Sequence, residues 1–138
     1  MATNTTAGPV IVVATDGSCG SVEAVEVGVD IGAHESGSLV FVRVLPEPAA
    51  ASAAEEPALA AAAASARLRG VPFAVELRSG DPAAEIVSLA DERRADLVVV
   101  GSRGLSRRAD GSVIGSVSRA VMRQCPRPVL VARGSRER

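Results

Sequence analysis

The segment from Val98 to Ser118, VVVGSRGLSRRADGSVIGSVS, constrains most strongly what this chain folds into and binds. Its run of valines predicts a buried strand that ends before Gly101, where a glycine-rich stretch begins. A second glycine, Gly115, stands before Ser116 and opens a pattern of helical spacing. At such a helix start, backbone N–H groups and the positive end of the helix dipole face an anion. The order of strand, glycine loop and helix therefore predicts a phosphate-binding element.

The composition excludes several other kinds of site. All 15 basic residues are arginine, so the chain has neither a Walker A P-loop nor a Schiff-base lysine. The one histidine, His34, argues against a Ser-His-Asp triad and a multi-histidine metal site, and we expect it exposed at a helix end. Aromatic residues make up 1% of the chain, which leaves no stacking platform for single-stranded nucleic acid. A net charge of −1 argues against nucleic-acid and anionic-membrane partners.

The 138 residues are the length of one domain. We expect the domain at residues 9–133, with disordered tails at residues 1–8 and 134–138. The first residues lack the charged and apolar regions of a signal peptide, and no apolar run approaches the ~20 residues of a membrane span. The sequence therefore predicts a cytoplasmic protein. Cys19 and Cys125 are expected at opposite ends of the strands, ~17 Å apart for strands of ~5 residues, which predicts two free thiols.

Alternating strand and helix patterns predict the fold class. Most strand patterns are apolar on both faces, which is typical of parallel strands covered by helices on both sides. The helix after the third strand has Asp81 as its expected N-cap and Pro82 at its first position. The segment between Pro46 and Pro57 is low in complexity, and we interpret it as a mobile surface connector rather than a lid. The predicted strands are Val10–Ala14, Leu39–Leu45, Phe73–Leu77, Leu97–Val100 and Val129–Ala132, and the predicted helices are Ser21–Ala33, Ala58–Arg69, Ala83–Arg94 and Ser116–Gln124.

These elements predict an α/β fold, an open five-stranded parallel sheet with helices on both faces. Ligands of such a sheet bind outside the carboxyl ends of the strands, where the strand order reverses. Three features fall there: Thr15-Asp16-Gly17-Ser18, the loop from Gly101 to Gly104, and Gly115-Ser116. Each alone has a structural alternative, namely a helix cap by Asp16 or Ser18, a tight turn, and a plain helix start. Together they favour a ligand site.

The region from residue 9 to residue 133 resembles the universal stress protein family. Four motifs carry the resemblance, three in or beside predicted strands and one at the start of the third predicted helix. They are T-D-G-S at Thr15–Ser18, G-D-P-x-x-x-I from Gly80 to Ile86, A-D-L-V-V-V-G-S-R-G at Ala95–Gly104, and P-V-L-V at Pro128–Val131. The resemblance implies a Rossmann-like sheet with strand order 3-2-1-4-5.

The resemblance also implies an adenine-nucleotide site, with ATP as the ligand, either alone or together with Mg²⁺. Asp16 would contact adenine or ribose, and Val44 would contact the base through its backbone. No carboxylate besides Asp16 is an evident metal ligand, and no metal-ligating residue is assigned. The cofactor-binding residues implied are Ala14, Thr15, Asp16, Val44, Val100, Gly101, Arg103, Gly104, Gly115, Ser116 and Val117.

The spacing of the glycines departs from the family pattern G-x2-G-x9-G-[ST]. Ten residues, Leu105 to Ile114, separate Gly104 from Gly115, where the pattern has nine. This difference affects how the phosphates align with the loop. A nucleotide with a different number of phosphates therefore stays open as an alternative ligand. Arg107 and Arg108 in the same loop are candidates for the outer phosphates, with ordinary solvation as the alternative.

The resemblance implies a regulatory stress-response protein whose output is nucleotide binding, rather than an enzyme. It further implies a homodimer through the last strand, Val129–Ala132, because an edge strand is a ready pairing surface. Three alternatives stay open: a nucleotide-free dimeric interaction module, a cyclic-AMP binder, and a slow ATP hydrolase that relies on Asp16.

Overall fold

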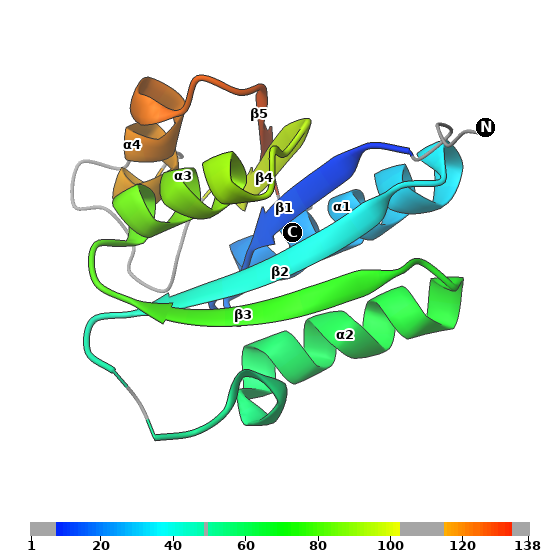
Figure 1. Cartoon of the computed structure of the whole chain (residues 1–138), viewed down its shortest axis with the longest axis horizontal. Coiled ribbons are helices and arrows are strands. Elements are labelled where there is room, and N and C mark those ends of the chain that lie inside the picture. The colour runs from blue at the N-terminus through cyan, green and yellow to red at the C-terminus, as the bar shows by residue number, and fades with distance from the viewer. Residues whose placement is uncertain (1–7, 49, 103–114, 134–138) are drawn as a thin grey trace, which may run out of the picture.

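The computed structural model describes residues 8–48, 50–102 and 115–133 of the chain. Strands and helices alternate through most of it, with one short 3₁₀ helix, η1 (Figure 1). In chain order the elements are β1 (Val10–Ala14), α1 (Cys19–Glu35), β2 (Ser38–Leu45), η1 (Ala53–Glu55), α2 (Pro57–Arg69), β3 (Phe73–Ser79), α3 (Pro82–Glu92), β4 (Leu97–Gly101), α4 (Ser116–Gln124) and β5 (Val129–Ala132).

The strands form one sheet in the order β3-β2-β1-β4-β5, and every neighbouring pair is parallel. This confirms the predicted fold class and the predicted strand order. The register aligns Val12 of β1 with Val40 of β2 and with Val98 of β4. Because β2 lies on one side of β1 and β4 on the other, the strand order reverses at the carboxyl ends of β1 and β4.

Two apolar layers hold the helices on the two faces of the sheet. One layer joins α1 and α2 to the sheet through side chains such as Ile11, Phe41 and Leu59. The other joins α3 and α4 to the opposite face through side chains such as Val12 and Leu89. Apart from Phe41 and Phe73 in the first layer, both layers are mainly aliphatic, as the shortage of aromatic residues requires. Figure 1 shows α2 beneath β2 and β3 and the α3–α4 pair on the other side of the sheet.

The ends of several elements differ from the prediction, and each difference has a local cause. β1, β5 and α4 have the predicted bounds. β3 continues to Ser79, two residues beyond the prediction, because Ser79 still pairs with Leu45 of β2. α1 begins at Cys19 because Ser18 is its N-cap and accepts a hydrogen bond from the amide of Ser21. α3 ends at Glu92, short of the predicted Arg94, which has a left-handed φ of 52°.

The segment between Pro46 and Pro57, predicted as a mobile connector, contains η1, and Pro57 opens α2. As expected, Asp81 caps α3, since its side chain accepts from the amide of Ala84, and Pro82 follows at the first helical position. Cys19 and Cys125 are free, as expected. Within the described ranges, no helix is long and apolar enough to pass through a bilayer.

Gly8, placed by the sequence in the N-terminal tail, packs against the backbone of Glu35 and Ser36 at the end of α1. The rest of the predicted tails, residues 1–7 and 134–138, lie outside the described residues, as does most of the glycine loop, residues 103–114.

Candidate functional site

The loop between β1 and α1 is a closely hydrogen-bonded turn at the reversal point of the sheet. Thr15 is buried, and its amide donates to the Val42 carbonyl at 2.9 Å, which extends the pairing with β2 by one residue. The hydroxyl of Thr15 lies 3.1 Å from that of Ser21 in the first turn of α1. Gly17 has a φ of 85°, a conformation that glycine adopts without strain. The loop is therefore fixed by β1, β2 and α1 together.

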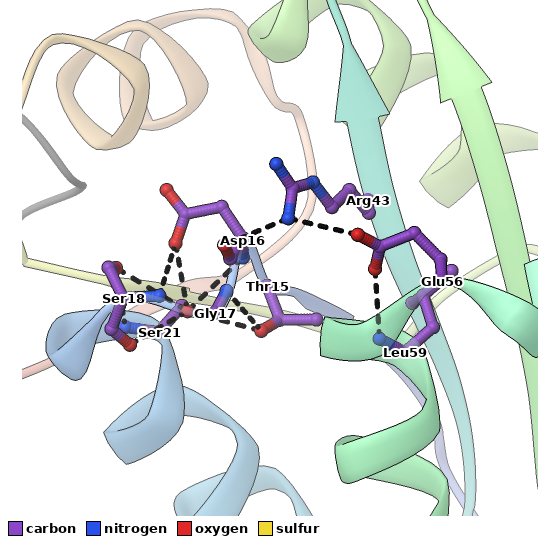
Figure 2. A network of polar contacts seen from close by, with 8 residues as sticks. All are labelled: Thr15, Asp16, Gly17, Ser18, Ser21, Arg43, Glu56 and Leu59. Atoms are coloured by element: carbon purple, nitrogen blue, oxygen red, sulfur yellow. Dashed lines mark hydrogen bonds and ion pairs between the residues drawn. The ribbon is translucent and has the colours of Figure 1, made fainter. Parts of the chain in front are cut away.

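Asp16 carries the one carboxylate of this turn, and its Oδ1 atom faces the start of α1 (Figure 2). Oδ1 accepts from the Ser18 amide at 2.9 Å and from the Ser21 hydroxyl at 3.0 Å. Half-burial disfavours the charged form, but the hydrogen bonds from Ser18 and Ser21 and the charge of Arg43 outweigh it. The pKa of Asp16 therefore lies below its ordinary value, and the group is ionised at neutral pH. Oδ2 accepts no hydrogen bond from the side chains and amides described, which leaves it available to a ligand hydroxyl or amine.

Arg43 projects from the end of β2 toward the backbone of the same turn. Its Nη1 atom donates to the carbonyl oxygen of Asp16 and to Oε2 of Glu56, both at 3.0 Å. Glu56 caps α2 through its other oxygen, Oε1, which accepts from the Leu59 amide at 3.1 Å. Figure 2 shows Arg43 between Asp16 and Glu56. One guanidinium thus links the β1–α1 loop to the start of α2.

The start of α4 is joined to the end of β4 by two hydrogen bonds. The Gly115 amide donates to the Ser102 carbonyl at 2.6 Å, and the Ser118 hydroxyl donates to the Gly101 carbonyl. Ser102 and Ser118 are both buried. The Ser102 amide in turn donates to the carbonyl of Ala132 in β5. The first turn of α4 is therefore placed at the carboxyl edge of the sheet, on the opposite face from the first turn of α1.

The two helix starts differ in their capping. Ser18 caps α1 with its side chain, whereas Gly115, the N-cap of α4, has no side chain that could do so, and no other described side chain caps α4. Ser116 and Val117 follow and are exposed. Backbone N–H groups of a helix's first turn lack partners within the helix, so an uncapped start presents donors to an external acceptor. The helix dipole adds a preference for negative charge at this point.

The sequence-predicted residues that the structure describes gather at this edge. Ala14 ends β1 and is followed by Thr15 and Asp16. Val44 lies near the end of β2, and Val100 precedes Gly101, the last residue of β4. Arg103 and Gly104, together with Arg107 and Arg108, lie outside the described residues.

Four residues of the site had no predicted role, namely Ser21, Arg43, Glu56 and Ser118. Arg43 carried a signal in the sequence, since it is the one charge within the apolar run of β2. The other three are ordinary helix-start residues whose partners lie far away in the sequence or in the loop before the helix.

Metal ligation is a separate question at this edge. In the part of the chain that the structure covers, no three His, Cys, Asp or Glu side chains gather in a way that could hold an ion. The described site therefore does not fit a metal ion held by the protein alone.

The chain is similar to known proteins over most of its length. The model of the universal stress protein family matches residues 9–133. The chain belongs to the universal stress protein family. Universal stress protein Rv1636 of Mycobacterium tuberculosis is 31% identical over 137 residues, which cover 88% of this chain and 93% of that protein. Universal stress protein MJ0531 of Methanocaldococcus jannaschii is 38% identical over 64 residues, which cover 46% of this chain and 37% of that protein. The match therefore spans well under half the length of that relative.

Solved structures of universal stress proteins share the fold. One, determined in complex with cAMP, is 34% identical, with a TM-score of 0.76 over 94% of this chain and 99% of the other. Another, from Archaeoglobus fulgidus in complex with dAMP, has a TM-score of 0.71 at 23% identity, over 91% and 97% of the two chains. The second likeness concerns the fold alone.

Proposed function

We propose that this protein binds an adenine nucleotide, with ATP as the ligand, at the carboxyl edge between β1 and β4. The observation that carries the proposal is the pairing of an uncapped helix start at Gly115 with an ionised carboxylate at Asp16. The first offers donors to phosphate oxygens, and the second offers an acceptor to the hydroxyls or amine of a nucleoside. A ligand with an anionic end and a hydrogen-bond-donating end fits both.

The remaining contacts follow from the sheet. Val44 lies one residue before the end of β2, beside the Asp16 loop, and its backbone would contact the base. Gly101 and Ser102, at the end of β4, are hydrogen-bonded to the first turn of α4, where the phosphates would lie. Arg103 and Gly104 complete the glycine pattern of the family resemblance. A Mg²⁺ ion, if it accompanies ATP, would be held mainly by the phosphate oxygens.

The role we propose is regulatory binding rather than catalysis, in the cytoplasm and in a homodimer. Hydrolysis needs a group that positions or deprotonates water. Asp16 is the one carboxylate of the β1–α1 turn, and its low pKa makes it a weak base. For the dimer, β5 is an edge strand of the sheet, and its Leu130 is partly exposed.

The test is a calorimetric titration of the protein with ATP, with Gly115→Val as the variant. Gly115 has extended backbone angles, φ −72° and ψ 168°, which valine adopts freely, but it is buried, so the unfolding midpoint of the variant is measured beside the titration to check that the fold is retained. The β-branched side chain should crowd the phosphate end and abolish binding. If the wild-type protein does not bind ATP, or if Gly115→Val binds as well as wild type, the proposed site is wrong.

Cyclic AMP is the second candidate ligand. The cAMP complex of a relative 34% identical to this chain favours it, as does the ten-residue spacing between Gly104 and Gly115. Parallel titrations with ATP, AMP and cAMP distinguish the candidates. If cAMP binds more tightly than ATP, cAMP replaces ATP as the proposed ligand. If none of the three nucleotides binds, the nucleotide-free interaction module remains.

A further inference from the structure

We propose that Arg43 and Glu56 form a positioning pair that sets the geometry of the Asp16 loop and so the affinity of the nucleotide site. The inference rests on the proposed function, because it concerns the same site. Neither residue belongs to the nucleotide contacts implied by the sequence. Their effect would pass through the carbonyl of Asp16 and the start of α2.

The first step of the argument is the geometry of the guanidinium. Nη1 of Arg43 donates to a backbone oxygen of the β1–α1 loop and to a carboxylate that caps a different helix. Arg43 lies two residues before the end of β2 and Glu56 is the N-cap of α2, so the pair, 13 residues apart, spans the connection between these elements. A shift of the Asp16 backbone therefore strains the contact with Glu56, and a shift of the start of α2 strains the contact with Asp16 (Figure 2).

The second step is the energetic cost of this arrangement. The side chains of Arg43 and Glu56 are 23% and 11% exposed, so both charges are largely withdrawn from water. The Nε atom of Arg43 is buried and has no hydrogen-bond partner. Partly buried ion pairs add little net stability, and an unpaired buried donor subtracts from it. A gain in folding stability therefore does not explain the arginine at this position. The fixing of the geometry of the Asp16 loop does explain it.

The third step is the position of Arg43 in β2. Strand residues alternate between faces, so Arg43 points to the α1–α2 face while Val44, the next residue, packs on the α3–α4 face. The guanidinium therefore fixes the strand end that carries the proposed base contact without occupying the base position. Its charge also contributes to keeping Asp16 ionised.

Arg127 is a close internal control. It too bonds one backbone carbonyl and one carboxylate, those of Ala95 and Asp91, and its Nε is also buried without a partner. Its side chain is 26% exposed, close to the value for Arg43. Ala95 precedes β4, so Arg127 lies at the amino ends of the strands, away from the nucleotide site.

The experiment compares Glu56→Gln and Arg43→Met with Asp91→Asn and Arg127→Met. Two quantities are measured: the amide hydrogen exchange of Ser18 and Ser21 in the ligand-free protein, and the dissociation constant for ATP. Glu56 touches no atom of the Asp16 loop in the described contacts, yet we expect Glu56→Gln to speed the exchange of both amides several-fold. We expect Arg43→Met to do the same and to weaken ATP binding about tenfold. Arg43→Lys, which keeps the charge on a shorter side chain, should recover part of the affinity.

The outcomes separate the positioning pair from the proposed function. Unchanged exchange in Glu56→Gln and Arg43→Met would overturn the coupling, whether or not ATP binds. Faster exchange with unchanged ATP affinity would overturn the positioning role. If the variants exchange faster but the wild type binds no nucleotide, the coupling is supported and the nucleotide function is rejected. If Arg127→Met weakens ATP binding as much as Arg43→Met does, the loss comes from general destabilisation. That result would overturn the proposal.

Discussion

Gly101, the last residue of β4, lies directly against Gly20 in the first turn of α1. A Cβ atom on Gly101 would stand 2.6 Å from the carbonyl carbon and oxygen of Gly20, a distance that real Cβ atoms do not reach. The absence of a side chain at Gly101 thus lets the end of β4 approach the start of α1. This contact brings the two loops of the proposed nucleotide site together at one edge of the sheet.

Replacement of Gly101 by alanine should therefore destabilise the fold. Because the clash is with backbone atoms, the two elements must separate, and we expect a loss of about 1–3 kcal/mol in the free energy of unfolding. Urea denaturation measures it. If Gly101→Ala weakens ATP binding but leaves the urea midpoint unchanged, the glycine serves the ligand alone and the packing argument is wrong.

The charge of Asp16 should make stability depend on pH in a defined direction. Its folded-state pKa lies below the ordinary 3.8, so the stability it contributes is complete above that value and is lost as the pH falls through the folded-state pKa. The free energy of unfolding of the wild type minus that of Asp16→Asn should be constant near neutral pH and shrink as the pH falls below 3.8. A difference that grows on acidification would show that the folded-state pKa is raised.

The hydroxyl of Ser118 should contribute to the position of α4. Ser118 is buried and donates to the Gly101 carbonyl, so Ser118→Ala removes one hydrogen bond and leaves that oxygen with one fewer donor. The expected loss is about 1 kcal/mol of unfolding free energy, measured in urea. Ser88→Ala is the control, because Ser88 is exposed on α3 and donates to the exposed Glu92. Equal effects of the two substitutions would contradict the assigned role of Ser118.

The proposed homodimer should depend on β5. Leu130 is 37% exposed on this edge strand, and a charge there would oppose the burial of a second copy. We expect Leu130→Glu to convert dimers to monomers in sedimentation equilibrium. Leu68→Glu, at an 87% exposed leucine on α2, should leave the mass unchanged. Dissociation by Leu68→Glu instead, or a wild type that is monomeric, would reject β5 as the interface.

Much of this fold is readable from the sequence because its signals are local. Continuous apolar runs gave the strands, and Asp81 with Pro82 marked the start of α3 by chemistry confined to four residues. Ser18 and Asp16 were both candidate caps, and the structure assigns the cap to Ser18 while Asp16 accepts from the Ser18 amide.

The contacts between Arg43, Asp16 and Glu56 could not be predicted in this way. They join residues 13 to 27 positions apart, through a long side chain whose direction depends on the finished sheet. The apolar run of β2 showed only that Arg43 was unusual. Likewise, the close approach of Gly101 to Gly20 depends on how α1 packs over β4, which no periodicity encodes.

The most direct test of the nucleotide function is to purify the protein, denature it, and identify any released small molecule by chromatography and mass spectrometry. The account predicts an adenine nucleotide, ATP, in near-stoichiometric amount. No released nucleotide, together with no binding when ATP, AMP and cyclic AMP are added to the native protein, would contradict it.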